Sequence, residues 1–130
     1  MPYYDEPYAT AWYDDEADAV VGELTEFTDG EAFRTYMESL IDAIEDTGTD
    51  TILADTSEFD SALTEEDQVW SVRDWAPRAE DAGLERMAMV MPEAVVAEMS
   101  VDSIVEMADD SLDRALFDDF EEAKAWARKQ

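Results

Sequence analysis

The sequence predicts an α/β protein with a mostly parallel sheet, an N-terminal hairpin and the element order ββαβαβαβα. Short apolar runs alternate with amphipathic segments, which is typical of parallel strands joined by right-handed helical crossovers. One of these segments, residues 33–44, carries a clear helical stripe of apolar side chains. No repeat, linker or low-complexity tract divides the 130 residues. We therefore expect one domain over residues 1–130.

The hairpin and the first helix are predicted from the N-terminal third of the chain. Residues 1–7 contain two prolines and are expected to form an irregular arm. Residues 8–13 and 19–27 are rich in β-formers, and the acidic segment 14–18 joins them, so they predict a hairpin that adds an antiparallel edge. The apolar stripe of the helix that follows consists of Phe33, Met37, Leu40, Ile41 and Ile44. Gly48 is placed to end this helix in the left-handed conformation.

The next strand, loop and helix start follow directly. Residues 51–54 predict a short buried strand that ends at Asp55, and residues 56–63 predict a loop. Thr64 is expected to cap the second helix, with Asp67 three residues later in a capping-box arrangement.

The rest of the chain predicts two further strands and more helix. Pro77 should kink or divide the second helix, and Gly83 should end it. Residues 87–91 predict a buried strand that Pro92 stops. The remaining expectations are one or two short helices over 93–109, a last strand over 112–117, and a final helix that Asp118 caps and that runs to Ala127.

The charge is the most unusual feature of the composition. The chain has 36 Asp and Glu residues against 8 Lys and Arg, a formal net charge of −28. In dilute buffer such a charge destabilises the compact state by self-repulsion. At about 1 M salt the Debye length is only about 3 Å, so most of the repulsion is screened. Because the acids are spread along every segment, we predict adaptation to very high salt.

The same composition disfavours several classes of function. An acidic surface without a basic patch repels nucleic acid and anionic membranes. The chain has no Cys and no His, which excludes thiol chemistry, Cys-based metal sites and an imidazole base. The sequence shows neither a signal peptide nor an apolar run of membrane-spanning length. It also contains no Gly-rich phosphate loop and no nucleophile elbow. We expect a cytoplasmic protein that is not membrane-embedded, is not an enzyme and needs no cofactor or metal.

Several stretches of the chain share a pattern with a known family. They are Leu53-Ala54-Asp55-Thr56, Glu65-Glu66-Asp67-Gln68-Val69-Trp70, Trp75-Ala76-Pro77-Arg78-Ala79, Ala82-Gly83-Leu84, Val90-Met91-Pro92-Glu93, Met99-Ser100-Val101 and the run from Phe117 to Trp126. The chain resembles the small SpoIIAA-like proteins of the STAS and SEC14-like group over about residues 8–126. The family's element order agrees with the one predicted from periodicity.

The resemblance implies a regulatory loop. In the sporulation regulators of this fold, a partner kinase phosphorylates a Ser in the loop after the third strand, and this controls partner binding. The matching stretch here begins Asp60-Ser61 and lacks the family's Gly. The resemblance therefore implies Ser61 as the phospho-acceptor, and Ser57 and Thr64 are weaker candidates. Because loops at the carboxyl ends of strands often carry function, we expect the loop from Asp55 to Thr64 and its flanking helix to be the partner contact. The alternatives are an ordinary turn role for Ser61 and a solvated or capping role for Asp55.

Two further sets of residues are candidates for binding. Met87, Met89 and Met91 alternate along one predicted strand and so point to one face. Because SEC14-like relatives bind lipids, the resemblance implies an apolar-ligand face there, and core packing is the alternative. Trp70 and Trp75 lie five residues apart and do not share one helix face cleanly. We expect one in the core and the other at a partner surface, where Trp is enriched.

The overall expectation is a non-catalytic regulatory or protein-interaction module that binds a protein partner. The alternative is a carrier or sensor of a small apolar ligand such as a lipid, and an enzyme that uses carboxylates comes third. The oligomeric state is left open, a homodimer included.

Overall fold

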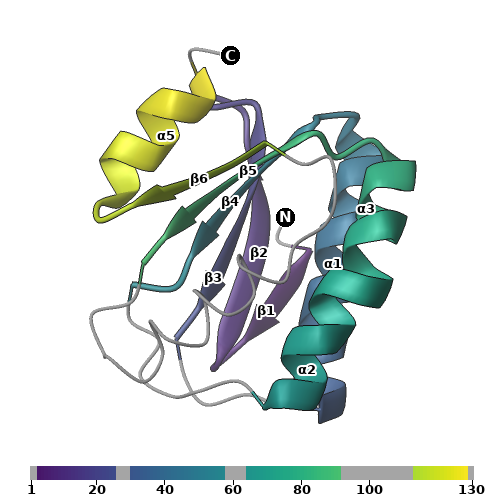
Figure 1. Ribbon diagram of the computed structural model, residues 1–130. Coiled ribbons are helices and arrows are strands. Elements are labelled where there is room, and N and C mark those ends of the chain that lie inside the picture. The colour runs from purple at the N-terminus through teal and green to yellow at the C-terminus, as the bar shows by residue number, and fades with distance from the viewer. Residues whose placement is uncertain (1–2, 26–29, 58–63, 92–112, 129–130) are drawn as a thin grey trace.

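The computed structural model of the protein describes residues 3–25, 30–57, 64–91 and 113–128 (Figure 1). The strands in these ranges are β1 (Tyr4–Glu6), β2 (Ala9–Asp14), β3 (Ala19–Leu24), β4 (Thr51–Asp55), β5 (Arg86–Val90) and β6 (Asp113–Phe117). The helices are α1 (Gly30–Thr47), α2 (Glu65–Trp70), a π-helix (Ser71–Trp75), α3 (Ala76–Ala82) and α5 (Phe120–Arg128).

The strands form one sheet in chain order, β1-β2-β3-β4-β5-β6. The pairs β1-β2 and β2-β3 are antiparallel, whereas β3-β4, β4-β5 and β5-β6 are parallel. The prediction of an α/β fold with a mostly parallel sheet and an N-terminal hairpin is therefore confirmed.

The irregular arm expected over residues 1–7 is wrong in part, because Tyr4–Glu6 forms strand β1. Tyr4 pairs with Ala11, and the N–H of Tyr3 donates to the carbonyl of Ala11 over 2.7 Å. The prolines of the arm precede and follow this strand, and an edge strand tolerates such neighbours. The tyrosines of this region that pack against the core are Tyr3, Tyr4 and Tyr8. The partial burial of these rings stabilises the strand, although the other residues of the arm are mostly polar.

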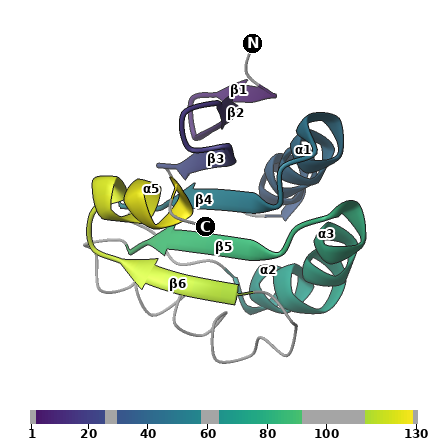
Figure 2. The same cartoon turned by 90° about the horizontal axis from the view of Figure 1, so that it is seen from above.

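Helices cover both faces of the sheet, with α1, α2 and α3 on one face and α5 on the other (Figure 2). Side chains alternate between the faces along each strand. Ile52 therefore belongs to the main core beneath α1 and α3, and its neighbour Leu53 belongs to a smaller core beneath α5. Both side chains are fully buried.

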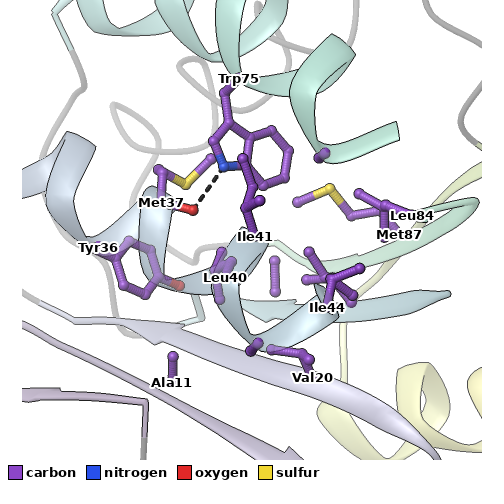
Figure 3. Close-up of a cluster of buried hydrophobic side chains, with 14 of the residues drawn as sticks. Ala11, Val20, Tyr36, Met37, Leu40, Ile41, Ile44, Trp75, Leu84 and Met87 are labelled. Atoms are coloured by element: carbon purple, nitrogen blue, oxygen red, sulfur yellow. Dashed lines mark hydrogen bonds between the residues drawn. The ribbon is translucent and has the colours of Figure 1, made fainter. Parts of the chain in front are cut away.

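Helix α1 supplies much of the main core (Figure 3). The predicted apolar stripe of this helix is confirmed, since Phe33, Met37, Leu40, Ile41 and Ile44 are all buried. The helix ends as expected at Gly48, which has a φ of +77° and whose N–H donates to the carbonyl of Ile44 over 2.9 Å.

The second helical segment begins and ends where the sequence predicts. The Thr64 hydroxyl oxygen accepts a hydrogen bond of 3.1 Å from the N–H of Asp67, as expected for the cap. Pro77 lies in the first turn of α3, directly after the π-helix that separates α2 from α3. Proline cannot donate to the carbonyl four residues earlier, so a regular ladder cannot pass through it. Gly83 ends α3 with a φ of +121°.

The C-terminal part forms β6 and α5. The helices predicted over 93–109 lie outside the described residues. The expected Asp118 cap is wrong by one position: α5 begins at Phe120, and the carboxylate of Asp119 accepts the N–H of Glu122 over 3.3 Å. Lys124 of α5 reaches Asp14 at the end of β2 over 3.2 Å, which ties this helix to the hairpin.

Candidate functional site

The loop implied by the resemblance begins with a local hydrogen-bonded turn. Asp55 lies at the carboxyl end of β4, and one of its carboxylate oxygens accepts the N–H and the hydroxyl of Ser57 over 3.0 and 2.7 Å. The hydroxyl of Thr56 donates to the carbonyl of Val90 on β5 over 2.7 Å. These contacts give Asp55 and Ser57 the roles of an ordinary turn. The candidate residues Asp60 and Ser61 lie outside the described residues, and Thr64 is occupied as the cap of α2.

The methionines of β5 lie on one face, as predicted, and that face is the main core. Met87 and Met89 are buried among the residues of α1 and α3, and Met91 is partly buried beside them. Figure 3 shows Met87 next to Leu84 and Ile44. This arrangement is what core packing predicts.

The two tryptophans of the second helical segment have different environments, as expected. Trp75 is 1% exposed, and its indole Nε1–H donates to the main-chain carbonyl of Met37 over 2.7 Å (Figure 3). Trp70 is only partly buried and packs edge-on against Phe33 of α1, with 6.1 Å between the ring centroids. Trp75 is therefore a core residue, and Trp70 lies at the surface.

Two arginines lie over the ring of Trp70. The guanidinium carbon of Arg34 on α1 is 5.2 Å from the ring centroid, and that of Arg78 on α3 is 5.9 Å from it. Both distances are in the range of a cation–π interaction. Because the whole chain has only 8 basic residues, the meeting of two of them on one tryptophan is a specific feature of this surface.

Each of these arginines also pairs with carboxylates of the opposite helix or the next turn. Arg78 binds Glu38 of α1 over 2.8 Å and Asp74 over 2.8 Å. The hydrogen bond that Arg78 donates to Glu38 raises the pKa of Arg78, burial opposes this rise, and the hydrogen bond to Asp74 adds to it. Arg34 lies 3.4 Å from Glu66 and 3.6 Å from the buried Asp67. The resulting row of paired charges forms a seam between α1 and the α2–α3 segment.

A surface groove of about 510 Å³ adjoins this seam at the start of α2. Its lining residues are Glu31, Arg34, Thr35, Glu38, Thr64, Glu66 and Asp67. Next to Trp70, the side chain of Val69 is exposed, with 39% of its surface accessible. We call the set Arg34, Val69, Trp70 and Arg78 the Trp70 face.

The Trp70 face offers binding contacts rather than a reactive constellation. It combines a tryptophan ring and two guanidinium groups, which are residue types enriched among those that carry binding energy at interfaces, with the exposed apolar side chain of Val69. In the part of the chain that the structure describes, no group of three or more acids converges as a metal site. No helix within the described ranges is long and apolar enough to cross a membrane.

The sequence indicated Trp70 but not its two arginines. Asp74 and Arg78 are four apart on one helix, and this spacing could have predicted their ion pair. The approach of Arg34 and Arg78 to one ring depends on how α1 packs beside α3, which no local pattern contains. Comparison of the chain with models of known protein families finds no match, and comparison with curated proteins finds none either.

Proposed function

We propose that this domain is a non-catalytic protein-interaction module of the SpoIIAA-like type and that the Trp70 face is its contact surface. The observation that carries the proposal is the placement of two of the chain's 8 basic residues over one surface tryptophan. Tryptophan and arginine are the residues most enriched among those that carry binding energy at interfaces.

The ion pairs of this surface are so exposed that their contribution to folding stability does not explain their presence. The side chains of Arg78 and Glu38 are each 42% exposed, and that of Glu66 is 85% exposed. Exposed ion pairs contribute about 0–1 kcal/mol each, and salt screens them further. A fixed pair of guanidiniums beside a partly exposed ring is better explained as a preorganised contact for a partner.

The remaining parts of the proposal follow the resemblance and the charge. The α/β element order supports the SpoIIAA-like assignment, and Thr64 links the groove to the loop in which the family carries its phospho-acceptor. We further propose a cytoplasm of high salt as the site of action, because the net charge of −28 is best tolerated there. Burial of Met87 and Met89 in the core gives the apolar-carrier alternative no specific support.

Site-specific photo-crosslinking in a native extract at molar KCl tests the proposal. The photoreactive group is placed at Val69, and in a control at Leu116 of β6, which is similarly exposed at 44%. We expect a protein adduct from the Val69 position that the Leu116 position does not give. Native mass spectrometry of the purified protein is the companion measurement, and a stoichiometric co-purified lipid would favour the carrier instead.

Binding of the identified partner is then measured with purified components. Trp70→Ala should weaken binding at least tenfold, the loss typical of a residue that carries binding energy at an interface. Trp126→Ala is the matched control, because Trp126 is also a partly buried helical tryptophan with an arginine, Arg86, 5.8 Å from its ring. Equal binding by wild type and Trp70→Ala, or equal loss in both variants, would contradict the proposal.

A further inference from the structure

Trp70 and Trp75 both face α1 although they are five residues apart. Trp70 contacts Phe33, and Trp75 contacts Met37, one turn further along α1. A regular α-helix turns about 100° per residue, so residues five apart point about 140° away from each other. A regular α-helix would therefore turn one of the two rings away from α1.

The π-helix at Ser71–Trp75 resolves this conflict. The N–H of Ala76 donates to the carbonyl of Ser71, five residues earlier rather than four. The widened turn absorbs one extra residue, so Trp70 lies about one turn before Trp75 and on the same side. The backbone stays helical throughout, with φ and ψ of −57° and −43° at Trp70 and −58° and −46° at Ala76.

The same residues can also be arranged in a second register, in which the helix has no π-helical turn. If the helix were α-helical throughout and Trp75 kept its place, the position one turn earlier would belong to Ser71, four residues before it. Each residue of α2 would then move into the place of its predecessor. Trp70 would take the exposed place of Val69, and its ring would leave the seam for solvent.

The sequence of α2 is compatible with both registers. In the shifted register Asp67 takes the place of Glu66, so Arg34 still faces an acid. Gln68, a neutral polar residue, takes the buried place of Asp67, which is 2% exposed. The shift recovers the regular α-helical hydrogen bonds as far as Ala76, just before Pro77, and loses the contacts of Trp70 with Phe33 and the two arginines. The gain in backbone hydrogen bonds therefore opposes the loss of side-chain contacts.

We propose that the π-helix is a register switch that moves Trp70 between the seam and solvent. The register of α2 then decides whether the Trp70 ring lies beside Arg34 and Arg78, which assembles the Trp70 face, or leaves both arginines for solvent, which takes the face apart. The functional half of this inference rests on the proposed function, since it takes Trp70 as a partner contact. The structural half concerns the helix alone and is measured without any partner.

Deletion of Arg73 tests the switch, because Arg73 is exposed and lies within the π-helix. Without it, Trp70 and Trp75 are four apart, and a regular α-helix holds both against α1. We expect NMR relaxation dispersion in residues 65–75 of the wild type, reporting a minor register populated at about 0.1–10%. The deletion variant should lose this exchange. A wild type without exchange, or a variant with unchanged exchange, would overturn the proposal.

A composition-matched swap keeps the test decisive if the deletion variant does not fold. The double variant Trp70→Ser/Ser71→Trp places the aromatic ring in the seam only in the α register, so its crystal structure should show a regular helix over 65–76. A retained π-helix in this variant would refute the switch. Exchange in the wild type together with unchanged partner binding by Trp70→Ala would instead uphold the switch and reject the proposed function.

Discussion

Arg78 binds Glu38 across the seam between α3 and α1, with 2.8 Å between Nη1 and Oε2, although the two residues are 40 positions apart. The indole of Trp75, three residues before Arg78, donates to the carbonyl of Met37, the residue before Glu38. Helix α1 and the α2–α3 segment are therefore joined twice, by charges at the surface and by a buried aromatic ring. The buried contact should dominate stability, because exposed ion pairs contribute little.

Trp75→Ala should lower the free energy of unfolding by about 3–5 kcal/mol, the range for removing a large aromatic side chain from a core. Trp70→Ala should cost clearly less, because Trp70 is only partly buried. Urea unfolding in molar KCl measures both. Similar losses in the two variants would show that Trp70 belongs to the core rather than to a binding surface.

Leu40→Ala should cost about 2–5 kcal/mol, because Leu40 is 1% exposed at the centre of the α1 stripe. Leu116→Ala is the control, since Leu116 is exposed, and changes at such positions usually alter stability by less than about 0.5 kcal/mol. Thermal or urea unfolding of both variants gives the difference. A loss below about 0.5 kcal/mol for Leu40→Ala would show that the face of α1 that carries Leu40 is not buried in the core.

Gly22→Ala should be destabilising because the added Cβ would overlap the hydroxyl of Tyr36 and touch Leu40. Overpacking of this kind costs about 1–3 kcal/mol. Tyr36→Phe removes the hydroxyl, so Gly22→Ala should cost less in the Tyr36→Phe background than in the wild type. A double-mutant cycle measures this coupling, and strictly additive effects would contradict the close approach of the two residues.

The regular elements were predictable because their signals are local. The α1 stripe, the Thr64 cap and Gly83 are each contained within about three helical turns or fewer, and the structure confirms all three. Strand β1 was missed because its burial comes from pairing with Ala11 and packing of tyrosines on the core, both non-local. The sequence also placed Trp70 and Trp75 on different helix faces. It could not reveal that a π-helix brings both onto α1, since Pro77 indicates an irregularity but not its kind.

Stability should fall above about pH 10, and Tyr36 should account for part of the loss. Burial, followed by the charges of Glu23 and Asp55, raises the pKa of Tyr36 above its ordinary value, which is about 10 in an unfolded chain. The protonated phenol thus contributes stability that is complete below pH 10 and is lost as the pH rises above that value. Urea unfolding between pH 9 and about 11 should show a shallower loss for Tyr36→Phe. Equal slopes for wild type and Tyr36→Phe would refute the assignment.

Salt should raise the thermal midpoint steeply, because the self-repulsion of a net charge of −28 outweighs the few attractive pairs of the seam. Between about 0.1 M and 2 M KCl the screening length falls severalfold from about 10 Å. This removes repulsion between distant carboxylates, whereas an ion pair in contact, such as Arg78 with Glu38, is screened less. The effect should shrink near pH 4, where unperturbed carboxylates are about half protonated and the repulsion is already reduced. Differential scanning calorimetry at both salt concentrations and both pH values provides the comparison. Equal midpoints in low and high salt at neutral pH would show that the acidic surface is not an adaptation to salt. A salt effect of the same size at pH 4 would show that the effect of salt does not arise from carboxylate repulsion.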